Sequence, residues 1–172
     1  MKMLGVVKLF VLPYNVSMTV ETKVILKLTL SQKTVSVAES CSGGLIAHRL
    51  TNVPGSSAVF LGGVVTYSNL AKQKVLRVPA DLISTHGAVS ADVALSMAQK
   101  VRSRHGSDYG LGVTGIAGPG GGSRQKPVGL VFIAVSSAKD ARCVECRLEG
   151  DRQAIKKKSS TKALKLLYEF AC

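Results

Sequence analysis

The sequence TVSVAESCSGG, residues 34–44, is followed directly by LIAHRL, residues 45–50. β-Branched and small residues alternate over 34–38, a pattern that predicts a β-strand. Apolar residues then recur at helical spacing over 45–50, which predicts a helix. Only ESCSGG at 39–44 separates the two patterns, and its serines and glycines are typical of a tight turn. A strand, a tight turn and a helix in immediate succession indicate an α/β fold.

Helical patterns recur along the rest of the chain. The spacing of apolar residues predicts helices over 18–32, 70–76 and 91–104 and after Asp151, with Ser68 and Ser90 as candidate N-caps. A short helix is expected to open at Pro79, because proline suits the first turn. The pattern over 18–32 is ambiguous, since leucines at every second position from 26 to 30 also fit a strand.

Strand patterns alternate with these helices. We expect strands over 58–67, 109–114, 128–136 and 142–148, and the short connection around 139–140 favours an antiparallel pairing of the last two. The alternation predicts an α/β protein, a three-layer α/β/α sandwich with a mixed β-sheet.

Length and composition indicate one globular domain. The chain has 172 residues, of which 46% are hydrophobic and 19% charged, so it can form a core and is too apolar to be disordered. Its longest apolar stretch, 4–13, is interrupted by Lys8 and is shorter than the ~20 residues of a membrane-spanning helix. No small-residue cleavage site follows at 14–17. We therefore expect a cytoplasmic protein without a membrane partner.

The four cysteines offer no metal or disulfide framework. Cys143 and Cys146 form a single Cys-x-x-Cys pair, whereas a structural zinc site needs a second pair of ligands at matched spacing. We expect reduced thiols, no metal and no cofactor.

The formal charge of +13 raises the question of nucleic acid. Six basic residues fall within 151–172, and the apolar residues there fit one helical stripe that leaves most lysines on the solvated side. Proteins that bind single strands use aromatic platforms, and this chain has four Phe, four Tyr and no Trp. A basic outer helix face is favoured over a nucleic-acid interface.

Three polar segments follow predicted strands, at 39–44, 67–72 and 114–123. Ligands of open α/β sheets bind beyond the carboxyl ends of the strands, so these segments are candidate sites. Residues 39–44 place two hydroxyls and a thiol on a glycine turn, which suits an activated nucleophile, but a serine-rich helix cap is the favoured interpretation of this segment alone. Cys41 is a weaker nucleophile candidate, because it lacks a histidine partner in a neighbouring loop. Lys72 can act as a base only if it is desolvated; otherwise it is a surface lysine.

The glycine loop at 115–123 matches no nucleotide motif. Residues 110–115 read GxGxxG, but the first two glycines lie inside a predicted strand and no helix follows. No GxxxxGK[ST] sequence is present. The loop either cradles a phosphate or substrate, or is an ordinary long connection.

Together these segments resemble the CinA C-terminal domain family. The resemblance rests on residues 38–44, then 63–69 with Lys72, the HGAVS of 86–90, the glycine loop with the KPVG of 126–129, and GDR at 150–152. It extends in order from about residue 34 to the end, so we divide the chain into a poorly matching segment, 1–33, and the family domain, 34–172. We expect a stand-alone form of the family, without the separate amino-terminal domain of longer CinA proteins.

The family includes nicotinamide-nucleotide amidohydrolases, which convert nicotinamide mononucleotide (NMN) into nicotinate mononucleotide and ammonia without a metal. The resemblance implies that Ser40 is the nucleophile, Lys72 the base and Tyr67 a supporting hydrogen-bond partner. It further implies backbone donors at Gly43 and Gly44 and substrate contacts from the remaining members of the set, namely Ser42, Asn69, Thr114, Gly115, Gly118 and Arg152.

The resemblance also carries expectations about partners. It implies a pyridine mononucleotide as ligand and self-association into a homo-oligomer. Its alternative is a non-catalytic nucleotide- or nucleic-acid-binding module related to competence and DNA damage, because some proteins of this fold lack the activity. Many relatives have an acidic or polar residue at the position of Gly120, which leaves the substrate contacts of the loop open.

Overall fold

The computed structural model describes residues 18–171. These residues form one five-stranded sheet in the order β2-β1-β3-β4-β5. Three parallel strands, β1 (Val35–Glu39), β2 (Phe60–Val65) and β3 (Tyr109–Gly115), are followed by the antiparallel β4 (Leu130–Ser136) and β5 (Ala141–Arg147). The mixed sheet and the terminal hairpin confirm the predictions.

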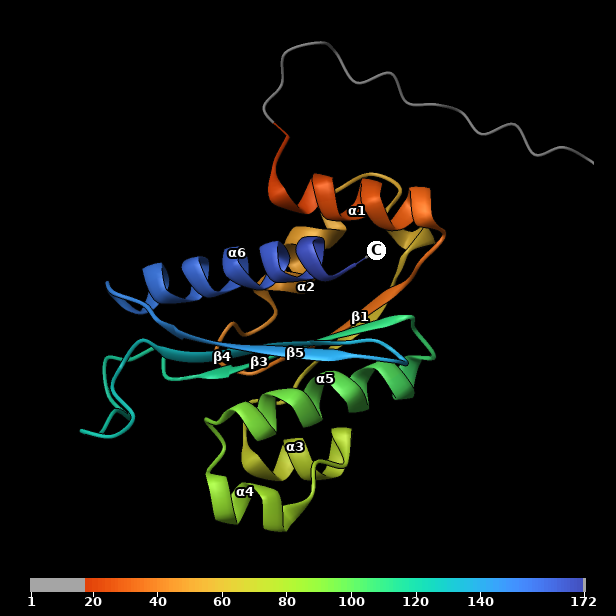
Figure 1. The fold of residues 1–172 in the computed structure, drawn as a ribbon. Helices are drawn as coiled ribbons and strands as arrows, with labels where there is room; N and C mark the ends of the chain where they lie inside the picture. The colour runs from red at the N-terminus through yellow and green to blue at the C-terminus, as the bar shows by residue number, and fades with distance from the viewer. Residues whose placement is uncertain (1–17, 172) are drawn as a thin grey trace, which may run out of the picture.

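Helices cover both faces of this sheet (Figure 1). One layer contains α1 (Val20–Ser31), α2 (Leu45–Thr51) and α6 (Arg152–Phe170). On the other face α5 (Ala91–His105) lies against the sheet, and α3 (Asn69–Leu76) and α4 (Ala80–His86) pack against α5. A 3₁₀ turn, Ser56–Ala58, precedes β2. The protein is therefore the three-layer α/β/α sandwich that was expected.

Local signals explain where the helices begin. Ser68, Ser90 and Asp151 each accept a hydrogen bond from the amide three residues later, so they are N-caps of α3, α5 and α6. Pro79 stands one residue before α4. The ambiguous segment 18–32 forms a helix, because the apolar residues at 24, 25 and 28 are buried together on one face.

Close packing of α5 explains the glycines of β3. A Cβ atom on Gly110 would collide with the carbonyl oxygen of Ala98, and one on Gly112 with that of Ala94. These glycines therefore serve helix-to-sheet contact rather than dinucleotide binding, which confirms the rejection of the Rossmann interpretation.

The Cys-x-x-Cys pair lies on β5. Cys143 packs with the alanines that join α5 to β4, whereas Cys146 belongs to the core beneath α6. Their spacing places the two thiols on opposite faces of the strand, so they cannot share a metal. Within residues 18–171 no group of three or more Cys, His, Asp or Glu side chains is arranged to hold an ion.

No helix between residues 18 and 171 has the length and apolar character needed to cross a bilayer. The apolar stretch at 4–13, on which the membrane and leader predictions rest, lies outside the described residues, as does Cys172. The domain division at 33/34 stays a prediction.

Candidate functional site

The carboxyl ends of the three parallel strands converge on a pocket. It has a volume of about 230 Å³ and is lined by Ser40, Cys41, Tyr67, residues 115–118, Gly120, Gly121 and Arg152. Ser40 follows β1, Tyr67 lies after β2, and the glycine loop follows β3. The three segments singled out in the sequence therefore meet, because parallel strands end at one edge of the sheet.

Lys72 contacts Ser40 from the interior of the protein. Its Nζ donates hydrogen bonds to the Ser40 hydroxyl at 3.0 Å and to the Thr66 carbonyl at 2.9 Å. The side chain is only 2% exposed, and Ser40 is 7% exposed. The cap at Ser68 starts α3 so that its first turn carries Lys72 inward. Lys72 is thus a buried lysine rather than the surface lysine that the sequence left open.

Burial sets the protonation of this amine. Desolvation lowers the pKa of Lys72 below its ordinary value of 10.5, because the charged form loses its hydration. Within residues 18–171 no carboxylate pairs with it. An amine that is neutral more often than usual, in hydrogen-bond contact with a hydroxyl, can accept the hydroxyl proton.

Glu39 holds the turn that presents Ser40. Its buried carboxylate accepts hydrogen bonds from the amides of Gly44, Ile46 and Ala47 at 2.9–3.1 Å. These bonds satisfy amides at the start of α2, so Glu39 joins the end of β1 to the helix. Gly43 and Gly44 have φ of 62° and 91°, backbone that only glycine adopts easily.

The same turn determines which amides are open to a ligand. The amide of Gly43 donates to the Ser40 carbonyl and that of Gly44 to Glu39, so neither is free in this conformation for the backbone-donor role that we predicted. The amides of Cys41 and Ser42 have no oxygen acceptor within residues 18–171. Amides without an oxygen acceptor in the turn that presents Ser40 can donate to an oxygen of a ligand.

Arg152 closes one side of the pocket. Its guanidinium donates to the Gly118 carbonyl and to the Tyr67 hydroxyl, both at 2.6 Å. The contacts hold the glycine loop, the segment that follows β2 and the start of α6 together, although they are far apart in sequence. Neither acceptor is a carboxylate, so the positive charge of Arg152 stays available to an anion.

Other predicted residues lie around the pocket rather than in its lining. The Thr114 hydroxyl is buried and donates to the Ala88 carbonyl. Asn69 is exposed at the start of α3, and Ser42 is fully buried with no hydrogen-bond partner for its hydroxyl within residues 18–171. Of the predicted set, the pocket lining therefore contains Ser40, Tyr67, Gly115, Gly118 and Arg152, with Lys72 behind Ser40.

Sequence reasoning gave no role to several participants. Glu39 is the clearest, and its signal was a carboxylate at the end of an apolar strand, six residues before a helix. The Thr66 carbonyl that orients Lys72 has no sequence signal. Cys41 lines the pocket, but burial raises the pKa of its thiol to about 11, so it is protonated at neutral pH and is a poor nucleophile.

The fold and this site define an α/β domain with a buried serine–lysine pair at the carboxyl ends of its parallel strands. The model of the CinA C-terminal domain matches residues 17–171, and the chain belongs to that family. The match begins before the start that the sequence motifs suggested.

Individual relatives agree with this assignment. The CinA-like protein of Geotalea daltonii is 50% identical over 149 residues, which cover 87% of this chain and 36% of that protein. The crystal structure of competence/damage inducible protein CihA from Agrobacterium tumefaciens is 41% identical with a TM-score of 0.84, covering 90% of this chain and 98% of that one. A competence-damaged protein (CinA) superfamily protein from Escherichia coli has 29% identity and a TM-score of 0.83, with coverage of 88% and 91%. The chain spans about a third of the curated relatives that it matches.

Proposed function

We propose that this chain is a nicotinamide-nucleotide amidohydrolase that releases ammonia from the carboxamide of NMN. The observation that carries the proposal is the 3.0 Å contact between the Ser40 hydroxyl and the buried amine of Lys72. A hydroxyl attacks an amide at a useful rate only when a neighbouring base takes its proton. Burial supplies that base by lowering the pKa of Lys72.

The first half-reaction is acylation. Neutral Lys72 accepts the Ser40 proton while Ser40 Oγ bonds to the carboxamide carbon, which turns the carbonyl oxygen into an oxyanion. The amides of Cys41 and Ser42 are the donors suited to it. The protonated Lys72 then delivers its proton to the departing nitrogen, and the C–N bond breaks to give ammonia and an ester on Ser40.

The second half-reaction restores the serine. Water loses a proton to Lys72 and attacks the ester carbon, and the same lysine returns the proton to Ser40 Oγ as the C–O bond breaks. The products are nicotinate mononucleotide and ammonium, so one water is consumed for each ammonia released. Such a reaction belongs to pyridine-nucleotide metabolism.

The substrate proposal rests on charge at the pocket. Arg152 presents an uncompensated guanidinium, and the glycine loop presents backbone beside it, which suits the phosphate of a mononucleotide. The net charge of +13 attracts anionic ligands generally. Self-association into a homo-oligomer, like the substrate, is a proposal from the family resemblance.

Ammonia release from NMN by the purified chain, with and without a chelator, tests the proposal. We expect turnover that the chelator leaves unchanged and that falls at least about 100-fold in Ser40→Ala and in Lys72→Ala, since each variant removes half of the pair. Ser84→Ala and Lys74→Ala alter exposed residues on neighbouring helices and serve as matched controls. A folded wild-type chain without turnover would refute the proposal and favour the non-catalytic binding module.

A further inference from the structure

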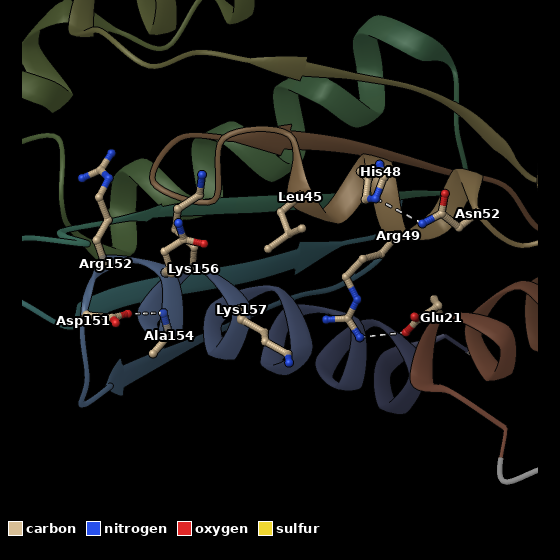
Figure 2. Close-up of a pocket in the computed structure, with 11 residues that line it drawn as sticks. Glu21, Leu45, His48, Arg49, Asn52, Asp151, Arg152, Ala154, Lys156 and Lys157 are labelled. Carbon is tan, nitrogen blue, oxygen red and sulfur yellow. Dashed lines mark hydrogen bonds and ion pairs between the residues drawn. The ribbon is translucent and has the colours of Figure 1, made fainter.

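A second, larger hollow lies between α2 and α6 (Figure 2). Its volume is about 800 Å³, and α1 contributes Glu21 at one end. Arg152 lines both this groove and the catalytic pocket, so the two hollows meet at its side chain. Apart from Arg152, the residues of the groove have no role in the proposed hydrolysis of the carboxamide.

The basic residues of the groove fall into two groups. Arg49 is fully engaged: it pairs with Glu21 at 2.7 Å and donates to the hydroxyls of Ser160 and Thr161. Arg152, Lys156 and Lys157, by contrast, have no carboxylate partner within residues 18–171. The second acid of the lining, Asp151, caps α6 through the Ala154 amide. Asp151 keeps its negative charge as a helix cap, so the lining has four cations against two carboxylates, a net charge of +2.

The position of Lys156 on α6 is unusual for a lysine. It precedes the fully buried Ala163 by seven residues, about two helical turns, and so lies on the packing face of the helix. At this end of α6 the packing face opens into the groove, where Figure 2 draws the Lys156 side chain. Its amine lies 3.3 Å from the point that a Cβ on Gly43 would occupy, against the turn that presents Ser40.

Three further lysines of α6 lie outside the groove lining. Lys158, Lys162 and Lys165 are exposed and lie roughly half a turn around the helix from Lys156. Lys158 donates to the Glu149 carbonyl outside the groove. The basic surface expected along this helix therefore divides into a solvated side and a side that lines a hollow.

We propose that the α2–α6 groove is a phosphate-binding site that accepts a pyrophosphate group. A doubly or more highly charged anion is the ligand that a hollow with an excess of positive charge favours, and lysine is a common phosphate ligand. The pyrophosphate is either the free ion or part of a nucleotide. The inference shares Arg152 with the amidohydrolase proposal, but its test requires binding and no turnover.

Calorimetric titration with inorganic pyrophosphate, at fixed and low salt, tests the site. Lys156→Gln combined with Lys157→Gln removes two positive charges from the groove, and Lys162→Gln combined with Lys165→Gln removes two from the solvated side. We expect the first pair to weaken pyrophosphate binding at least about 10-fold and the second less than about 2-fold. Lys157→Gln alone is the second variant should the groove pair fail to fold, with an expected loss of about 3-fold.

Equal losses of pyrophosphate affinity in the two double variants would overturn the proposal. They would mean that α6 is only a diffuse basic surface, which would attract nucleic acid as well. Absence of pyrophosphate binding by the wild-type chain would overturn it as well. A parallel titration with ADP identifies the source of the pyrophosphate group. ADP that binds more tightly than the free ion supports a nucleotide, and ADP that binds more weakly supports the free ion. In either case Lys156→Gln combined with Lys157→Gln must abolish the difference in affinity between the two ligands.

Discussion

Lys72→Met separates the catalytic role of the buried amine from its effect on stability. The Lys72 side chain is 2% exposed and has two hydrogen-bond acceptors but no carboxylate partner within residues 18–171. Methionine has nearly the same length and no charge, so it fills the same space without the cost of burying an ammonium group. We therefore expect activity to require the amine and folding not to require it.

The expected stability change is the difference of two terms. Removing an unpaired buried charge relieves a desolvation cost of several kcal/mol. Part of this cost is already avoided in the wild type, because the lowered pKa of Lys72 favours its neutral form. Against this, the Thr66 carbonyl loses its donor, at a cost of about 1–3 kcal/mol. We expect a net gain of about 1 kcal/mol at pH 7, which corresponds to a rise in Tm of about 2–4 °C for a chain of this size. Ammonia release from NMN falls at least about 100-fold.

The pH dependence of this gain follows from the direction of the pKa shift. The folded-state pKa of Lys72 is lower than that of the unfolded chain, so the unfolded state binds more protons as pH rises toward 10.5. The free energy of unfolding of the wild-type chain therefore increases with rising pH. The stability advantage of Lys72→Met over the wild type decreases accordingly.

Thermal unfolding by circular dichroism at pH 7 and pH 9, alongside ammonia release, measures both effects. Lys74→Met on the exposed side of α3 is the control. If Lys72→Met lost more than about 3 kcal/mol at pH 7, the ammonium would be a structural cation, and the reasoning would be refuted.

Three further predictions concern the same site. The pH profile of kcat/KM rises with an inflection below 10.5, because Lys72 must be neutral to act and burial lowers its pKa; an inflection at or above that value would exclude it as the base. Cys41→Ala keeps turnover within about 3-fold, since its thiol stays protonated; an activity loss equal to that of Ser40→Ala would show that the thiol reacts. Glu39→Gln lowers the free energy of unfolding by about 2 kcal/mol, measured in urea, because an amide replaces a carboxylate that accepts three backbone hydrogen bonds; unchanged stability would remove Glu39 from its positioning role.

Much of the fold was predictable because its signals are local. The alternation over 34–38, the glycines after it and the serine caps at 68 and 90 act on neighbouring residues, and each produced the expected element. The local sequence did not decide the secondary structure of 18–32, because its leucines fit both the helical and the strand period. Packing of its apolar face in the core decided it.

The site divides in the same way. Residue types and order marked Ser40, Tyr67 and Lys72 as candidates, and the family resemblance assigned them roles. No local pattern could distinguish a capping serine from a nucleophile or a surface lysine from a buried one. The contact between Ser40 and Lys72, 32 residues apart, exists only because β1 and β2 lie side by side in the sheet.

The sequence by itself therefore determined the elements, the order of the strand-end segments and the excess of positive charge. Tertiary structure alone decided that Lys72 is desolvated, that Glu39 binds the turn amides, and that the lysines of α6 divide between solvent and groove. The physical reason is that pKa shifts and uncompensated charge depend on which groups surround a side chain in space. Those neighbours come from segments that the sequence keeps far apart.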